Sequence, residues 1–145
     1  MSIVLLDTNI LLDAIANRPP FCVSAQKIFI QAAQETIDAH ITANSLTDIY
    51  YIARKVLSSA AAHSAIEDIL NVFSIVSIDE DDCKEAIDSG IDDFEDALIM
   101  VCAEKIKADY IISRDKSFQS STNTIKILSA DDFIAQNISY FLNEK

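Results

Sequence analysis

The chain of 145 residues is half hydrophobic, contains one glycine and two prolines, and carries a formal net charge of −12 from 23 acidic and 11 basic residues. Its length and apolar content predict a single domain over residues 1–145, and the scarcity of glycine and proline argues against long linkers or a sandwich of tight hairpins. The charge excludes a nucleic-acid binder that relies on a basic surface, so an acidic chain of this kind would approach RNA or DNA only with bound metal ions that invert the local field.

Apolar runs typical of buried strands alternate along the chain with helical patterns. The expected strands are Ile3–Leu6, Ile37–Ile41, Ile75–Ile78, Tyr110–Ile112 and Ile125–Leu128. A core helix is expected from Ile10, and further helices are expected over Phe21–Gln34, Ser45–Leu57, Ala60–Phe73, Asp81–Asp88, Phe94–Ile106 and Ala130–Leu142. Strands separated by helices in this way predict an α/β domain with a mainly parallel sheet.

The cysteines and the hydropathy pattern indicate where the chain resides. Cys22, Cys83 and Cys102 are odd in number and form no CxxC pair, which predicts reduced thiols of a cytoplasmic protein and neither a disulfide framework nor a zinc site. No apolar run approaches the roughly 18–20 residues that a membrane span needs, and the first residues lack a charged signal-peptide front. We therefore expect a cytoplasmic protein without a membrane anchor.

Four aspartates fall where the expected elements make them interesting. Asp7 follows the first strand, Asp115 follows the fourth, and Asp48 and Asp96 lie in the first turns of expected helices. Because strand ends and the helix starts that follow them share one edge of a parallel sheet, these side chains could converge there. Clustered carboxylates stay charged together only beside a cation, and Mg²⁺ and Mn²⁺ prefer such oxygen ligands.

Helix capping is the competing interpretation of these acids. The segments Ser45–Asp48, Asp93–Asp96 and Ser129–Asp132 all have the spacing of a capping box, so for Asp48 a solvated or capping role stays open. Asp96 is different, because the seven residues after it lack a polar side chain and predict a helix buried on all sides. A carboxylate at the start of such a helix is partly desolvated, which favours a functional role.

Four segments in order along nearly the whole chain resemble the acidic motifs of PIN-domain ribonucleases. They read LDTNILLD from Leu6, SLTDIYY from Ser45, DFEDAL from Asp93 and ISRDKSF from Ile112. The resemblance implies a Rossmann-like three-layer α/β/α fold with a mainly parallel sheet of about five strands. It also implies one site for Mg²⁺ or Mn²⁺ at which the acidic positions meet.

The resemblance assigns roles residue by residue. Asp7, Asp96 and Asp115 match acidic positions directly, and Asp48 matches a position that is often Glu in the family. The polar positions near the metal would be Thr8, Asn9, Asp93 and Ser113, with Glu95 as a further acid. The cations that could contact phosphate are Arg114 and Lys116, together with Arg54 and Lys55.

The function predicted from this pattern is metal-dependent endonucleolytic hydrolysis of RNA. The resemblance implies a VapC-like toxin of a type II toxin–antitoxin pair, with an RNA substrate, a cognate antitoxin protein and a homodimer as expected partners. Two alternatives stay open. One is a catalytically weak PIN-like module that binds RNA or protein, and the other is a phosphotransfer domain with Asp7 as nucleophile, which would need a second Asp where this chain has Asn9.

Overall fold

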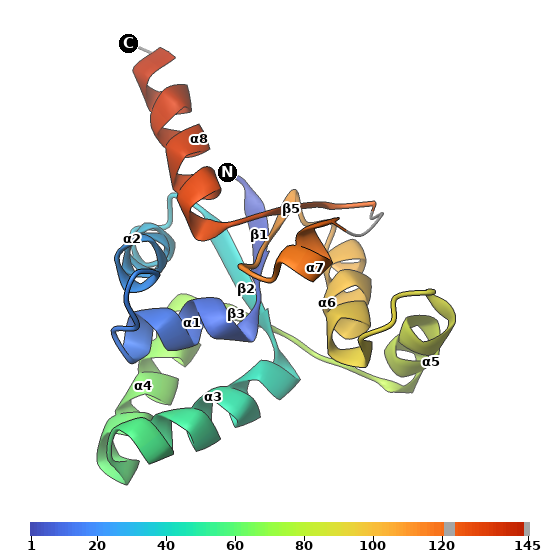
Figure 1. Cartoon of the computed structure of the whole chain (residues 1–145), viewed down its shortest axis with the longest axis horizontal. Helices are drawn as coiled ribbons and strands as arrows, with labels where there is room; N and C mark the ends of the chain where they lie inside the picture. The colour runs from blue at the N-terminus through green and yellow to red at the C-terminus, as the bar shows by residue number, and fades with distance from the viewer. Residues whose placement is uncertain (121–123, 144–145) are drawn as a thin grey trace.

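The computed structural model describes residues 1–120 and 124–143. A sheet of five parallel strands forms its middle layer, in the order β3-β2-β1-β4-β5 (Figure 1). The strands are β1 (Ile3–Leu6), β2 (Asp38–Thr42), β3 (Ser74–Val76), β4 (Tyr110–Ile112) and β5 (Lys126–Leu128). All five predicted strands are confirmed, with small shifts at the ends of β2, β3 and β5. From β1 the sheet extends through β2 and β3 on one side and through β4 and β5 on the other, so the order of the strands reverses at β1. In parallel sheets, ligands bind beside the carboxyl ends of the strands at such a point.

Helices cover both faces of the sheet (Figure 1). They are α1 (Thr8–Ile15), α2 (Cys22–Ala33), α3 (Ala43–Val56), α4 (Ser59–Val72), α5 (Glu80–Asp88), α6 (Phe94–Lys105), α7 (Lys116–Ser120) and α8 (Ala130–Asn143). Apolar side chains of α1 to α4 and of α8 share one core cluster with the sheet, whereas those of α6 and α7 form a second cluster on the opposite face. The predicted three-layer α/β/α fold is therefore confirmed.

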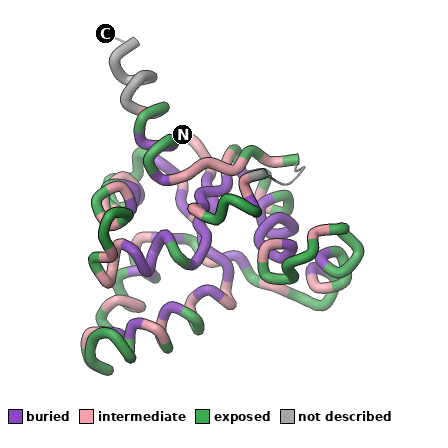
Figure 2. Tube along the Cα trace, viewed as in Figure 1, coloured by how far each residue is buried: buried purple, intermediate pink, exposed green. Residues whose placement is uncertain are grey.

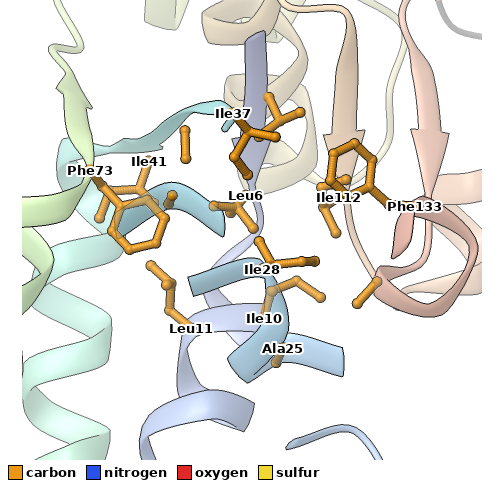
Figure 3. Packing of buried hydrophobic residues seen from close by; sticks show 14 of the residues in the cluster. Leu6, Ile10, Leu11, Ala25, Ile28, Ile37, Ile41, Phe73, Ile112 and Phe133 are labelled. Carbon is orange, nitrogen blue, oxygen red and sulfur yellow. The ribbon is translucent and has the colours of Figure 1, made fainter. Parts of the chain in front are cut away.

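The central strand explains why the first apolar run is continuous. Val4 and Leu6 point into the first cluster and Leu5 into the second, because successive strand residues face opposite sides of a sheet. All three side chains are fully buried, as expected for a parallel strand covered on both faces. Figure 3 shows Leu6 between Ile10 and other labelled side chains of the first cluster, and Figure 2 shows the buried residues running through the middle of the molecule.

Helix α6 is buried on all sides, as its sequence predicts. Every residue from Ala97 to Ala103 is buried, because α6 packs against the sheet on one side and against α5 on the other. Its first turn, with Asp96, is left at the carboxyl edge of the sheet. Within the described part of the chain, no helix is both long enough and apolar enough to cross a membrane.

Two features of the fold differ from the sequence prediction. Helix α3 begins at Ala43 with Thr42 as its N-cap residue. Ser45 is therefore not a cap, and the predicted place of Asp48 in the first turn is wrong. The short helix α7 was not predicted. It forms because Asp115 caps its start and because Phe118, only 2% exposed, anchors it in the second cluster.

The other capping predictions are confirmed, with one unexpected burial. Asp93 accepts a hydrogen bond from the backbone N–H of Asp96 (3.0 Å), and Ser129 accepts one from that of Asp132 (3.1 Å). The acidic run Asp79–Asp82, which the sequence predicts to be a helix start with solvated charges, forms a reciprocal capping box between Asp79 and Asp82 at the start of α5. The helix start is confirmed, but Asp82 is not solvated, because it is 7% exposed and pairs with Lys105 at 2.7 Å.

Two adjacent residues of α4 test where the first cluster ends. Ile69 is fully buried and Leu70 is 52% exposed. Ile69→Ala should lower the free energy of unfolding by about 2–5 kcal/mol, because it removes buried methyl groups and leaves a cavity. Leu70→Ala should change it by less than about 1 kcal/mol. Urea denaturation followed by circular dichroism measures both, and equal losses would contradict this packing.

Candidate active site

Asp7 lies at the carboxyl end of the central strand and is held at both carboxylate oxygens. Its backbone N–H donates to the carbonyl of Ile112 (2.9 Å), which continues the contact between β1 and β4. The Ser113 hydroxyl donates to Oδ2 (2.9 Å), and the backbone N–H of Thr8 donates to Oδ1 (2.8 Å). Asp7 as a whole is 9% exposed. The fold therefore fixes a largely buried carboxylate at the centre of the sheet edge.

Asp115 reaches the same place from the end of β4. The Ser113 hydroxyl that donates to Asp7 also accepts from the backbone N–H of Asp115 (3.1 Å). The Asp115 carboxylate accepts from the backbone N–H of Ser117 (2.9 Å) and so caps α7. One serine hydroxyl thus connects the two strand-end aspartates, and the role of Ser113 as a polar neighbour of Asp7 follows directly from these contacts.

Asp96 completes the group from the start of α6. Burial is the largest cause that raises its pKa to about 7, and the negative charges of Asp93, Asp7, Asp115 and Glu95 raise it further. Burial also raises the pKa of Asp7, although the hydrogen bonds from Ser113 and Thr8 offset part of that effect. Each of the two aspartates therefore resists ionisation more than an exposed aspartate does, because neighbouring negative charges add to the effect of burial.

Asp48 joins the group through Glu95, which the sequence suggested only as a further acid. Asp48 is exposed on α3. Burial and, after it, the charges of Asp48, Asp7 and Asp93 raise the pKa of Glu95, which indicates that Asp48 lies beside Glu95. The structure therefore brings all four predicted aspartates into one electrostatic cluster, with Asp48 at its outer side.

Thr8 and Asn9, which were predicted to lie near the metal, form hydrogen bonds with other residues. Thr8 shares a hydrogen bond of 2.8 Å with the hydroxyl of Ser45, which in turn shares one of 2.9 Å with the hydroxyl of Thr42. These contacts join the start of α1 to the start of α3. Ser45 is 1% exposed, and sequence reasoning missed it because its spacing to Asp48 suggested a cap. Asn9 is exposed and accepts from the Arg18 guanidinium at 3.4 Å.

The predicted phosphate-binding cations lie in different places. The guanidinium of Arg114 donates to a buried acid, Asp13, at 2.8 and 3.3 Å. Lys116 is exposed at the start of α7. Arg54 and Lys55 lie in the last turn of α3, at the end of that helix away from β2. Sequence reasoning missed Asp13. A signal was available, because an acid that follows Ile10-Leu-Leu on a buried helix needs a partner for its charge.

A hollow of about 450 Å³ opens beside the acidic cluster. It lies between the segment that joins α5 to α6 and the start of α7, and its lining residues are Ser89, Gly90, Ile91, Asp92, Asp93, Asp96, Ser117 and Phe118. Gly90 turns the chain there with a φ of +80°, a conformation that favours glycine. Asp96 is therefore reachable from solvent through a depression that can admit a ligand group.

The donor chemistry suits a hard divalent cation. In residues 1–120 and 124–143, no three His, Cys, Asp or Glu side chains stand in position to hold one ion together. Mg²⁺ typically uses only one or two protein carboxylates and keeps several waters. The carboxylates present supply oxygen ligands alone, which select Mg²⁺ or Mn²⁺ over softer metals, and a cation would relieve the repulsion that raises the pKa of Asp96.

Comparison with known proteins identifies the family. The PIN domain model matches residues 3–117. The chain belongs to the PIN domain family. Ribonuclease VapC1 of Aquifex aeolicus is 29% identical over 136 residues, which cover 90% of this chain and 92% of that protein. The resemblance seen in the four acidic motifs is thus confirmed.

Solved PIN structures have the same fold. VapC20 of Mycobacterium tuberculosis, a sarcin-ricin loop cleaving toxin, superposes with a TM-score of 0.67 at 13% identity and covers 83% of this chain and 96% of its own. The DNA-bound VapBC of Salmonella typhimurium gives a TM-score of 0.67 at 16% identity and covers 90% and 99%. A toxin–antitoxin complex from Klebsiella pneumoniae gives 0.65 at 18% identity and covers 88% and 97%. At these identities, the likeness establishes the fold.

The raised pKa of Asp96 predicts how stability depends on pH without metal. An aspartate whose pKa is about 7 when folded and 3.8 otherwise holds an extra proton in the folded state between these values. The free energy of unfolding should therefore fall as pH rises from about 4 to 7, by at most about 1.4 kcal/mol per pH unit from this residue. Asp96→Asn should flatten this decline and be more stable than wild type at pH 8, but not at pH 4.

Denaturation in EDTA at several pH values measures the effect. Asp68→Asn, at an exposed position of α4, is the matched control and should keep the wild-type pH dependence. If the Asp96→Asn and wild-type curves ran parallel across this range, the crowding of Asp96 by its neighbours would be contradicted.

Proposed function

We propose that this protein is a metal-dependent endoribonuclease that hydrolyses phosphodiester bonds of RNA and acts as the toxin of a type II toxin–antitoxin pair. The observation that carries the proposal is the cluster of Asp7, Asp96 and Asp115 at one sheet edge, where burial and mutual repulsion raise the pKa of the first two. Membership of the PIN family and the likeness to a relative named as a ribonuclease support the choice of RNA.

Asp7, Asp96 and Asp115 would hold Mg²⁺ or Mn²⁺, directly or through water. A bound ion of this kind polarises a phosphoryl oxygen and lowers the pKa of a coordinated water, so that hydroxide is available at neutral pH. The chain fixes Asp7 through Ser113 and through the N–H of Thr8. This arrangement keeps the central carboxylate in place while Asp96 approaches from the first turn of α6 and Asp115 from the segment between β4 and α7.

The outer side of the cluster is suited to proton transfer. After burial, the charge of Asp48 is among the causes that raise the pKa of Glu95, so the two carboxyl groups lie close together. A carboxylate in this position would accept the proton of the attacking water. We assign Asp48, with Glu95, to the orientation and deprotonation of that water.

A cognate antitoxin is the protein partner that we infer. Several solved relatives are toxin–antitoxin complexes. Large apolar side chains stand exposed on two helices: Val23 and Ile30 on α2 are 58% and 53% exposed, and Tyr51 on α3 is 57% exposed. Exposed apolar groups that gather on a surface are typical of a protein contact. A homodimer stays a family expectation.

A catalytically weak binding module is the second candidate. It is favoured by the observation that no three ligand-type side chains in the described residues stand ready to hold one ion. The exposed position of Asp48, where the family often has Glu, points in the same direction. Such a protein would keep the fold and the partner surface but would not turn over RNA.

Cleavage of a panel of structured and single-stranded RNAs with Mn²⁺ or Mg²⁺ tests the proposal. Asp7→Asn and Asp96→Asn should each lower the rate by more than the roughly 10- to 100-fold typical of losing an outer-shell partner, because each removes a carboxylate that holds metal. Asp82→Asn is the matched control, because Asp82 is also buried but pairs with Lys105 away from the cluster. Its rate should stay near that of wild type.

The outcomes separate the two candidates. Metal-dependent cutting that survives Asp7→Asn and Asp96→Asn would place the activity elsewhere or in a contaminant. If the folded wild type bound RNA or a partner protein but cut no RNA in the panel, the binding module would be favoured.

The net charge predicts that RNA binding itself depends on metal. With 23 acids against 11 basic residues, the protein should repel phosphates unless cations reduce the negative potential at the site. Nuclease-resistant RNA should bind several-fold more tightly with Mn²⁺ than in EDTA at the same ionic strength. Fluorescence anisotropy with a salt titration measures this, and tight binding in EDTA would contradict the expected role of the charge.

A further inference from the structure

Asp13 is a fully buried acid in the apolar run of α1. Burying a carboxylate away from water is costly unless a cation and hydrogen bonds compensate it. The compensation comes from Arg114, whose Nε and Nη2 atoms donate to the two oxygens at 2.8 and 3.3 Å. Arg18 adds a longer contact at 3.7 Å. This fork-shaped pair is the geometry in which arginine holds a carboxylate most firmly.

Arg114 is also held from its other side. The centre of its guanidinium lies 4.3 Å from the centre of the Phe21 ring, a cation–π contact that further fixes the planar group. The guanidinium is therefore confined between Asp13 on α1 and the residue that precedes α2. A side chain held in this way constrains the backbone to which it is attached.

That backbone belongs to the segment that builds the active site. Arg114 stands between Ser113, which donates to Asp7, and Asp115, which caps α7. The side chain of Gln119 closes the segment by donating to the carbonyl of Ser113 at 2.5 Å. Ser113 is thus tied to Asp7 and Arg114 to Asp13, whereas Asp115 caps the helix that follows it. The contact of Arg114 joins the segment to the body of α1.

We propose that Asp13 is a positioning residue that, through Arg114, sets where Ser113 and Asp115 stand relative to Asp7. It thereby determines how tightly the cluster binds a divalent cation. The inference rests on the metal site of the proposed function. Arg114 then serves as a structural anchor, and contact with substrate phosphate becomes an alternative that the experiment distinguishes.

Mn²⁺ affinity, measured by calorimetry without RNA, is the first readout. Asp13→Asn and Arg114→Gln should each weaken Mn²⁺ binding about 10- to 100-fold, the range typical of partners that orient ligands. Hydrogen exchange of the backbone amides from residue 113 to 118 should become faster in both variants, because the segment loses its tie to α1. Asp82→Asn is the matched control, since it breaks another buried pair, with Lys105 at the far end of α6.

The control separates positioning from a general loss of stability. Asp82→Asn should destabilise the fold while leaving the Mn²⁺ affinity and the exchange of residues 113–118 unchanged. The Mn²⁺ affinity of the double variant Asp13→Asn/Arg114→Gln should equal that of the single variant with the lower affinity, because both substitutions break the same contact. Arg114→Lys keeps the charge but not the paired hydrogen bonds, so its Mn²⁺ affinity should lie between those of wild type and Arg114→Gln. It replaces Asp13→Asn in the test if that variant does not fold.

Three outcomes would overturn the proposal. They are an unchanged Mn²⁺ affinity in folded Asp13→Asn or Arg114→Lys, an equal loss in the Asp82→Asn control, and no Mn²⁺ binding by the wild type. Weaker RNA binding by Arg114→Gln with an unchanged Mn²⁺ affinity would instead identify Arg114 as a phosphate contact. Failure of the nuclease proposal is separate, because a wild type that cuts no RNA can still bind Mn²⁺ and show every expected effect.

Discussion

The mutual repulsion of carboxylates at one edge of the sheet is the constraint around which this protein is built. A parallel sheet brings the ends of β1 and β4 and the start of α6 together, and each of these places carries an aspartate. The hydrogen bonds that hold Asp7 come from neutral donors, a serine hydroxyl and a backbone N–H. They fix the carboxylate without neutralising it, so the cluster keeps the negative charge that a divalent cation would balance.

Elsewhere in the molecule, buried acids are paired with basic side chains. Asp13 pairs with Arg114 and Asp82 pairs with Lys105, so two basic side chains compensate acids that have a structural role. Both pairs tie helices or loops into place, whereas Asp7 and Asp115 of the candidate site accept hydrogen bonds from neutral groups, a serine hydroxyl and backbone N–H groups. The acids gathered at the candidate site, which no basic residue of these two pairs compensates, account for part of the net charge of −12.

Hydroxyl groups connect this charged edge to the rest of the fold. The contacts from Thr8 through Ser45 to Thr42 join the starts of α1 and α3, and the Ser113 hydroxyl joins Asp7 to the segment of Asp115. Short neutral side chains of this kind satisfy buried polar groups without adding charge. They make the position of each carboxylate depend on several elements at once, which suits a site that must hold like charges close together.

The sequence by itself determined the layered α/β fold and the positions of Asp7, Asp96 and Asp115. Apolar periodicity and the residue that follows a strand or opens a helix are local properties, so they can be read without knowing how distant segments pack. Only the tertiary structure decided that Asp13 holds Arg114, 101 residues away, and that Asp48 meets Glu95. It also showed Ser45 as a buried link and not a cap. Such pairings depend on which helix faces pack together, and local sequence does not specify that.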